Sequence, residues 1–354
     1  MVQIADIPVK RIYRSRVMEL DFDKLEFGKH ISDHMLVADY REGGWQQPVI
    51  TPFANLSVNP AALALHYGQT VFEGMKAFRL PDGRVNIFRL DRHYERFARS
   101  LERMCMAVPP REMFREGMIK LIKTDRAWVP RQKGASLYIR PFMYASEARF
   151  GVKVSDEYRF IIMTGPVPEL YSRPIRVKVE TNYIRAARGG TGYAKCGGNY
   201  GAAFLPTQLA RKEGYDQVLW TDAKENRFIE ESGTMNVLFV INGKLVTPPI
   251  SDSILDGITR DALLALAKEM EIDAEVRPVS VDELEQAFRD HTITEAFGAG
   301  TAAVVAPVQT IGIRDAEYTL PAYTADSILN RLKDKLEKIR TGLEEDMFGW
   351  NTLV

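Results

Sequence analysis

The sequence predicts a mixed α/β protein made of two domains. Its 354 residues are about twice the length of an ordinary single domain. Strand-like and helix-like segments are interleaved, and tight turns such as Pro81-Asp82-Gly83 and Asn242-Gly243 join neighbouring strands. Interleaved elements with several hairpins favour two mixed α/β domains over one parallel sheet.

The domain boundary is predicted by a cluster of prolines. Pro166, Pro168 and Pro174 fall within ten residues, between two strand-like segments. Such a segment is typical of an interdomain linker. We therefore expect a smaller N-terminal α/β domain over residues 1–167, a connector over 168–180 and a larger C-terminal α/β domain over 181–354.

The individual elements follow from residue type and periodicity. Phe97, Leu101 and Met104 recur at helical spacing after Asp91, which is a suitable N-cap, so we expect a helix over 91–106. The same reasoning predicts helices over 258–270 and 325–343. Segments rich in β-branched and aromatic residues predict strands over 71–80, 84–90, 136–145, 158–164, 175–180, 216–220, 235–240 and 244–249.

Composition restricts the class of partner. Forty-seven lysines and arginines balance forty-seven aspartates and glutamates, so no basic excess points to nucleic acid or to an acidic membrane surface. The longest uncharged stretch, 297–313, is 17 residues long and contains Pro307, which is unsuited to a membrane span. Two cysteines are too few for a disulfide framework, and no secretory signal is visible at the N-terminus. We expect a soluble, cytoplasmic protein whose partners are small molecules or other proteins.

Lys195 is the first candidate for chemistry. It lies in the stretch YAKCGGNYG, residues 193–201, which is rich in glycine and otherwise uncharged. A desolvated lysine amine can act as a nucleophile and form a Schiff base with a carbonyl compound. A nucleotide-binding P-loop is excluded because Ala194 precedes this lysine and Cys196 follows it. The competing interpretation is an ordinary solvated lysine, and Cys196 is best interpreted as a small buried residue.

Three features could hold an anion. Gly257, Ile258 and Thr259 open a predicted helix, whose first N–H groups face any phosphate placed there. In isolation, a simple helix cap by Asp256 is the better interpretation. The stretch GAGTAA, residues 298–303, matches a dinucleotide fingerprint, but a strand-like segment follows it instead of a helix. That stretch is therefore either a plain turn or a turn whose amides, with the Thr301 hydroxyl, bind an anion.

Two sets of basic residues complete the candidates. Arg92, Arg96, Arg99 and Arg103 share one face of the helix over 91–106, where a solvated stripe is the commoner explanation and Arg96 is a candidate phosphate ligand. Tyr138 and Arg140 lie two apart on a strand and face the same side, so this arginine could bind a carboxylate or be an ordinary edge-strand residue. His30 and His34 have no third ligand, and we expect no metal.

Taken together, these segments resemble one known family. LHYGQTVFEGMKAFR, LYIRP, AKCGGNYG, ESGTMNVLF, LDGITRDALL, FGAGTAA and EEDMFGW occur in this order. They are similar to the motifs of branched-chain-amino-acid aminotransferases, which are pyridoxal-phosphate enzymes of fold type IV. The resemblance runs from about Phe27 to the end of the chain and is to the longer members of the family.

The resemblance implies roles around pyridoxal 5'-phosphate. Lys195 would form the internal aldimine and, once displaced by substrate, move the proton between the substrate α-carbon and C4′ of the cofactor. Tyr200 would hydrogen-bond the phenolic oxygen, and Glu231 would pair with the pyridine nitrogen, while strand alternation would turn Glu230 to the other face. The residues implied in binding the phosphate are Arg96, Gly257, Ile258, Thr259 and Thr301.

The resemblance also implies the reaction and the substrate pocket. The reaction is reversible transamination between L-leucine, L-isoleucine or L-valine and 2-oxoglutarate, giving branched-chain 2-oxo acids and L-glutamate. The active site would lie between the domains of a homodimer and be completed by a loop of the second subunit. An apolar wall would be made by Phe27, Tyr67, Phe72 and Tyr138. The carboxylates would be met by Arg140, Thr234, Gly300, Thr301 and Ala302.

One departure from the family pattern and three alternatives remain. Asp256 stands where the family usually has proline, which adds a negative charge near the expected phosphate site. A D-amino-acid aminotransferase or an aminodeoxychorismate lyase of the same fold would keep the lysine and the glutamate, but Tyr138-x-Arg140 together with Gly300-Thr301-Ala302 resembles the L-branched-chain pattern. The third alternative is a non-catalytic binder of small molecules. The preferred branched substrate, and biosynthetic against degradative use, stay open.

Overall fold

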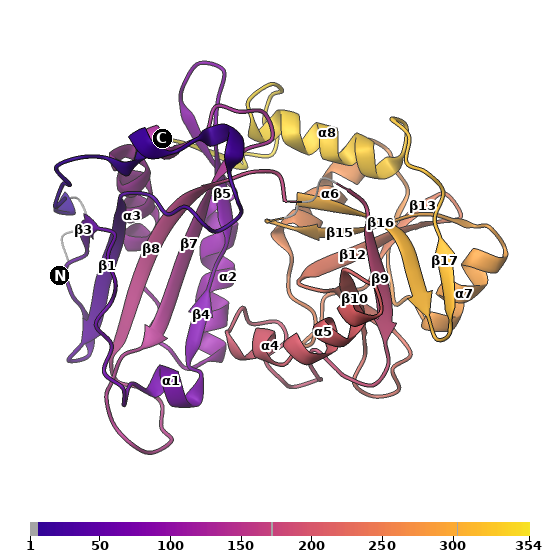
Figure 1. Ribbon diagram of the computed structural model, residues 1–354, viewed down its shortest axis with the longest axis horizontal. Coiled ribbons are helices and arrows are strands. Elements are labelled where there is room, and N and C mark those ends of the chain that lie inside the picture. The colour runs from indigo at the N-terminus through magenta and orange to yellow at the C-terminus, as the bar shows by residue number, and fades with distance from the viewer. Residues whose placement is uncertain (1–5, 171–172, 303) are drawn as a thin grey trace. The chain divides into compact units, whose positions relative to one another are not determined.

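The computed structural model describes residues 6–170, 173–302 and 304–354 (Figure 1). These residues form two compact units. The first unit holds residues 6–170, Ala194–Gly198 and Arg340–Val354, and the second holds residues 173–193 and Asn199–Ile339. Two short segments from beyond residue 181 thus belong with the first unit, which a division at a single linker does not foresee. The expected domain limits stay a prediction, and residues 171 and 172 of the expected connector lie outside the described residues.

The first unit is built on an antiparallel sheet. Among the described residues, nine strands take part, in the order β18-β6-β5-β7-β8-β1-β2, with β3 paired to β1 and β4 paired to β7. Both β4 and β5 pair with β7, at different positions along it, so the two residues between them lie at the same edge of that strand. The strands are β1 (His34–Arg41), β2 (Gly44–Trp45), β3 (Val49–Pro52), β4 (Thr70–Phe72), β5 (Met75–Arg79), β6 (Val85–Phe88), β7 (Ser136–Ala145), β8 (Tyr158–Val167) and β18 (Asn351–Leu353).

Helices α2 (Leu90–Arg103) and α3 (Arg111–Thr124) pack against each other and against this sheet (Figure 1). Their apolar faces, which include Phe97 and Phe114, share one core with strand residues such as Met75 and Phe160. The predicted helix is confirmed, but Asp91 lies in its first turn because the N-cap is Arg89, at φ 53°. The remaining helices of this unit are α1 (Leu63–Tyr67) and the 3-10 helices η2 (Arg16–Glu19), η3 (Phe22–Lys24) and η4 (Arg126–Trp128).

The second unit is built on a sheet that closes on itself. Strand β11 pairs with both β10 and β12, so the order β11-β10-β9-β16-β15-β12 forms a ring, which β13 and β14 extend from β12 and β17 from β16. Strand β9 is parallel to both of its neighbours, whereas most other pairs are antiparallel. The strands are β9 (Ile175–Glu180), β10 (Gln217–Thr221), β11 (Ile229–Ser232), β12 (Met235–Ile241), β13 (Lys244–Thr247), β14 (Ala274–Val276), β15 (Ile293–Gly300), β16 (Val304–Ile313) and β17 (Ala316–Thr319).

The mixed α/β fold class is confirmed by both sheets and by the helices that accompany them. The predicted helices over 258–270 and 325–343 are present as α6 (Ile258–Glu269) and α8 (Ile328–Arg340). The other helices are α4 (Gly198–Gly201), α5 (Phe204–Lys212) and α7 (Val281–Arg289). None of the helices formed by the described residues has the length and apolarity needed to cross a membrane.

The GAGTAA stretch ends one strand and precedes another, so it is not a dinucleotide fingerprint. Strand β15 ends at Gly300, and β16 begins at Val304 and pairs back onto it. The first turn of a helix, which would hold a dinucleotide phosphate, is not present at this position among the described residues. Ala303, the last residue of the stretch, lies outside them.

Candidate active site

Lys195 lies on a short extended segment that adds to the edge of β4. The N–H of Phe72 donates to the carbonyl of Lys195 at 3.0 Å, and the N–H of Gly197 donates to the carbonyl of Thr70 at 3.2 Å. Because side chains alternate along an extended segment, Ala194 and Cys196 face the core of the first unit and Lys195 is half-buried on the opposite side. The interpretation of Cys196 as a small buried residue is thus confirmed.

The surroundings of Lys195 come from β4 and α2. Its Nζ lies 4.9 Å from the ring centroid of Phe72. Its backbone N–H donates to the Ser100 hydroxyl at 2.9 Å, and this hydroxyl in turn donates to the carbonyl of Arg96. A Cβ at Gly197 would come within 2.5 Å of the Thr70 hydroxyl, so the glycine after Cys196 permits the close pairing with β4. Within the first unit, the lysine is therefore held by its backbone and presents its amine beside an aromatic ring.

Arg96 belongs to a buried ionic cluster. It is 4% exposed, whereas Arg92, Arg99 and Arg103 on the same helix are half-buried or exposed. The interpretation of the arginine stripe as a solvated face is therefore wrong for Arg96. Its Nε and Nη2 donate to the two carboxylate oxygens of Glu73 at 2.7 and 2.9 Å.

The cluster also contains His93, and neither this histidine nor Glu73 was among the sequence candidates. The Nδ1 of His93 lies 2.9 Å from Oε2 of Glu73. Burial raises the pKa of the Glu73 carboxyl, but the charge of Arg96 and the contact with His93 outweigh it and hold this pKa well below its usual range. Burial lowers the pKa of His93, so a neutral imidazole donates to a charged carboxylate. A signal was present in the sequence, since His93 and Arg96 are three apart on one helix face.

Four of the expected substrate-binding residues are brought together on the first sheet. Nη2 of Arg140 donates to the Tyr138 hydroxyl at 2.8 Å, which confirms that the two side chains share a face. The Arg140 guanidinium lies 4.8 Å from the ring centroid of Phe72, and Phe27 packs edge-on against Tyr138 at 5.4 Å. Nε of Arg140 is buried and has no hydrogen-bond partner among the described residues. Aromatic rings thus surround a guanidinium that retains an unsatisfied donor.

Tyr67, the fifth expected pocket residue of this unit, has a different setting. It ends α1, is 42% exposed, and its hydroxyl accepts from the N–H of Gly151 at 3.2 Å. Gly151 lies in the loop between β7 and β8, which also carries Phe150 and Val152, both more than 80% exposed. Tyr67 therefore connects α1 to a loop whose apolar side chains face outward.

In the second unit, Glu231 is a buried carboxylate held by three groups. Its Oε1 accepts from the N–H of Leu255 at 2.6 Å, and the side-chain amide of Asn236 lies 3.5 Å away. Nε of Arg185 lies 3.2 Å from Oε2. The neighbouring Glu230 has a different partner, the hydroxyl of Ser253, and burial raises its pKa. The two adjacent carboxylates thus have different partners, in line with strand alternation.

The loop before α6 is tied to Glu231. The side-chain amide of Asn236 donates to the carbonyl of Leu255 at 2.9 Å. The N-cap of α6 is Gly257, and no side chain within the described residues caps the helix. The interpretation in which Asp256 serves as this cap is therefore wrong. The first N–H groups of α6, which belong to Ile258 and Thr259, are not used by a cap, as an anion site requires.

The other expected residues of the second unit lie in turns. Thr234 is exposed in the turn between β11 and β12, and Thr301 and Ala302 are half-buried in the turn after Gly300. These two turns are neighbours because Asn236 of β12 pairs with Ala299 of β15. Tyr200 is half-buried in α4, which immediately follows the lysine segment.

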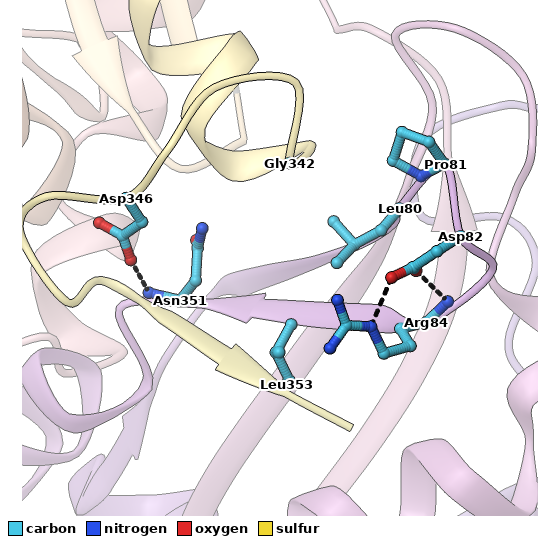
Figure 2. Close-up of a pocket in the computed structure, with 8 residues that line it drawn as sticks. All are labelled: Leu80, Pro81, Asp82, Arg84, Gly342, Asp346, Asn351 and Leu353. Carbon is cyan, nitrogen blue, oxygen red and sulfur yellow. Dashed lines mark hydrogen bonds and ion pairs between the residues drawn. The ribbon is translucent and has the colours of Figure 1, made fainter.

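A separate pocket of about 360 Å³ lies where the turn between β5 and β6 meets the C-terminal segment (Figure 2). Asp82 pairs with the Nε of Arg84 at 2.5 Å, and Asp346 accepts from the N–H of Asn351 at 2.7 Å. The carboxylates of its wall are thus engaged with other wall residues. None of the residues expected to bind cofactor or substrate lines this pocket, so we do not assign the chemistry to it.

Comparison with known proteins defines the class. Residues 70–311 match the family model described as amino-transferase class IV, and this match covers more than half of the chain. The matched region contains the lysine segment, the Arg96 cluster and the Glu231 loop. The fold is that of the fold type IV aminotransferases.

Named relatives place the chain within that class. Branched-chain-amino-acid aminotransferase 2 of Bacillus subtilis is 41% identical over 338 residues, which are 94% of this chain and 93% of the relative. The solved branched-chain aminotransferase of Thermoproteus uzoniensis with norvaline has a TM-score of 0.73 and 26% identity, over 90% of this chain and 99% of that one. The enzyme from T.th., solved in complex with N-(5'-phosphopyridoxyl)-L-glutamate, has a TM-score of 0.72 and 26% identity, over 89% and 97%. The chain belongs to the branched-chain-amino-acid aminotransferases, which exchange amino groups between amino acids and 2-oxo acids.

Proposed function

We propose that this chain catalyses reversible transamination between L-leucine, L-isoleucine or L-valine and 2-oxoglutarate. The products are the branched-chain 2-oxo acids and L-glutamate, and the cofactor is pyridoxal 5'-phosphate. The observation that carries the proposal is the Lys195 segment, in which a backbone-anchored lysine lies beside Phe72 on the unit that also holds Arg96 and Arg140. The complex of the T.th. relative with a phosphopyridoxyl derivative of glutamate supports both the cofactor and the second substrate.

The residues present suit this cofactor. A phosphate dianion needs several N–H and cationic groups, which Arg96, the first N–H groups of α6 at Ile258 and Thr259, and the Thr301 hydroxyl would supply. Glu231, held in place by Leu255, would accept the proton-bearing pyridine nitrogen. Tyr200 would donate to the phenolic oxygen. When bound, the cofactor supplies a carbonyl carbon that takes up the amino group and a ring that withdraws electrons from the reacting carbon.

The chain's own contribution to proton transfer comes from Lys195. Its Nζ would bind the cofactor covalently in the resting enzyme and be released when the amino acid takes its place. The released amine would then remove the proton from the α-carbon of the substrate and return it at C4′ of the cofactor. The backbone hydrogen bonds to Phe72 and Ser100 keep the amine close to the same place in both roles.

The substrate pocket must accept both an aliphatic side chain and the γ-carboxylate of glutamate. Phe27, Phe72 and Tyr138, with Tyr67, would form its apolar wall. The unsatisfied Nε of Arg140 suits a carboxylate, because the guanidinium already lies against two aromatic rings. The other proposed contacts for carboxylates are Thr234, Gly300, Thr301 and Ala302.

Gly257 offers a test of the proposed phosphate site. A Cβ there would overlap Oδ1 of Asn236 and lie 3.3 Å from Cβ of Arg260, so Asn236 would have to move and release Leu255. Overpacking of this kind costs about 1–3 kcal/mol. We expect Gly257→Ala to lower the free energy of unfolding in urea by this amount and to weaken binding of pyridoxal phosphate in a titration.

The matched control for that variant is Gly44→Ala. A Cβ at Gly44 meets no atom within 4 Å, and the backbone there is not left-handed, so stability and cofactor affinity should stay close to wild type. If Gly257→Ala binds the cofactor as tightly as Gly44→Ala does, the loop before α6 does not hold the phosphate.

We propose that the enzyme is a homodimer in which the loop between β7 and β8 lies against the second copy. Phe150, Val152 and Val154 in this loop are 86%, 83% and 51% exposed, which is unusual for three apolar side chains so close together. Tyr67, a proposed pocket residue, contacts the same loop through Gly151. An interface there would cover the apolar side chains and lie next to a residue of the proposed substrate wall.

The cytoplasmic location stays a proposal that rests on the cysteines. Cys105 and Cys196 are both free thiols. Free thiols without disulfides suit a reducing compartment.

The proposed reaction is tested with a panel of amino donors. Purified protein, pyridoxal phosphate and 2-oxoglutarate are mixed with L-leucine, L-isoleucine or L-valine, and glutamate is measured. We expect glutamate from all three donors and none from D-alanine. Activity with D-alanine or with an aminodeoxychorismate substrate, and none with the three L-amino acids, would assign the chain to another member of the same fold.

A further inference from the structure

We propose that Glu73 is a positioning residue that fixes the Arg96 guanidinium for the phosphate of the cofactor. The inference rests on the proposed function, because it takes pyridoxal phosphate as the ligand. It concerns a carboxylate whose two oxygens both contact the proposed phosphate ligand.

The backbone of Glu73 is fixed by the sheet. Glu73 and Gly74 are the two residues between β4 and β5, which lie along the same edge of β7. The N–H of Glu73 donates to the carbonyl of Pro141 on β7 at 2.7 Å. A Cβ at Gly74 would overlap the Tyr138 hydroxyl, so the chain has little room to shift at this point. The carboxylate is therefore carried by a rigid part of the first unit, and it is fully buried.

The contacts of the carboxylate determine the orientation of Arg96. It takes the N–H of Nε and one N–H of Nη2, which is a side-on fork that fixes the plane of the guanidinium. A guanidinium has five N–H groups, so Glu73 engages only part of this donor set. His93 donates to the same carboxylate and the N–H of Gly74 adds a further contact, so the acceptor itself is held from several sides. An arginine without such a partner would have several rotamers to choose from.

The same arrangement relates Arg96 to Lys195. Ser100, one turn further along α2, accepts from the N–H of Lys195 and donates to the carbonyl of Arg96. Phe72, which precedes Glu73, donates its N–H to the carbonyl of Lys195. The cation proposed for the phosphate and the amine proposed for the carbonyl carbon are thus attached to the same two elements, α2 and β4. Fixing Arg96 sets the distance between the two ends of the ligand.

Charge alone predicts the opposite effect of removing Glu73. A carboxylate beside Arg96 opposes the approach of a phosphate dianion, so on electrostatic grounds a neutral residue should strengthen phosphate binding. If orientation matters more than this repulsion, the neutral residue should weaken it. The sign of the change therefore separates the two explanations.

The experiment is a comparison of pyridoxal phosphate with pyridoxal, which lacks the phosphate. Each is titrated into the cofactor-free full-length protein and followed by absorbance, so the readout is binding and not turnover. We expect Glu73→Gln to reduce the preference for pyridoxal phosphate over pyridoxal by about tenfold, as loss of a charge-assisted contact does. Affinity for pyridoxal should change little.

Asp125→Asn is the matched control. Asp125 is also a buried carboxylate of the first unit, and it accepts from both the N–H and Nδ1 of His34, at 2.8 and 2.6 Å. This variant should lose stability in thermal denaturation but keep the wild-type preference for pyridoxal phosphate. Should Glu73→Gln not fold, Glu73→Asp retains the charge, withdraws it by one methylene group, and should show the same loss of preference.

The outcomes separate the inference from the function on which it rests. An unchanged or increased preference in both Glu73 variants overturns the positioning role of Glu73. An equal loss in the Asp125→Asn control also overturns it, since the effect would then be a general consequence of a damaged core. A wild-type protein that does not distinguish pyridoxal phosphate from pyridoxal contradicts the proposed phosphate site itself.

Discussion

Replacing Lys195 with alanine should reduce transamination by on the order of 10⁴-fold, because the variant loses both the covalent attachment of the cofactor and the group that moves the proton. The cofactor should still bind, since Arg96 and the start of α6 would still meet its phosphate. The visible absorption band of the lysine-bound cofactor should be absent. Steady-state rates with L-leucine and an absorption spectrum of the loaded protein measure the two effects.

Lys123→Ala is the control for this variant. Lys123 is an exposed lysine near the end of α3, so its loss should leave rate and spectrum unchanged. A small primary amine added to the Lys195→Ala protein should restore part of the rate, because it supplies a base at the position of the missing Nζ. Transamination by Lys195→Ala at a substantial fraction of the wild-type rate would refute the role of Lys195.

Replacing Glu231 with glutamine should lower kcat by about 10²–10³-fold, the usual effect of removing one charged group that stabilises a transition state. A neutral amide cannot keep a proton on the pyridine nitrogen, so the ring would withdraw electrons less strongly from the reacting carbon. KM should change less than kcat, because Glu231 does not contact the substrate in this proposal. Steady-state kinetics over a range of L-leucine concentrations give both parameters.

Glu230→Gln is the matched control, one residue away on the same strand. Burial raises the pKa of the Glu230 carboxyl, and its partner is the Ser253 hydroxyl instead of Leu255. A glutamine resembles the protonated form of this side chain, so kcat should stay within a few-fold of wild type. Equal losses in the two variants would mean that neither carboxylate is specific for the cofactor.

The local elements were predictable from the sequence because their signals are local. The turn Pro81-Asp82-Gly83 joins β5 to β6, and Asn242-Gly243 joins β12 to β13, as the turn residues indicated. The helix at Ile258 begins at its predicted first residue. The closure of the second sheet through β11, and the return of the lysine segment to the first unit, depend on contacts between distant residues and have no periodic signature.

The candidate site was predictable to the extent that its residues lie in short motifs. Lys195 and Glu231 were found in this way, whereas their hydrogen-bond partners come from other parts of the chain and are visible only in the fold. Glu73 was missed because it lies 23 positions from Arg96, and only the fold makes the two an ion pair. Asp256 was misjudged for the same reason. It looked like a helix cap, but the side chain of Asn236, which lies 19 positions before Leu255, holds the loop instead.

The most direct test of the proposed function follows the nitrogen atom. Wild-type protein and Lys195→Ala are incubated in parallel with pyridoxal phosphate, 2-oxoglutarate and L-leucine labelled with ¹⁵N, and the glutamate formed is analysed by mass spectrometry. We predict ¹⁵N-labelled glutamate from the wild type, together with an equal amount of the 2-oxo acid of leucine, and almost none from the variant. Unlabelled glutamate, or no glutamate, from the wild-type protein would contradict the claim that this chain moves the amino group of a branched-chain amino acid.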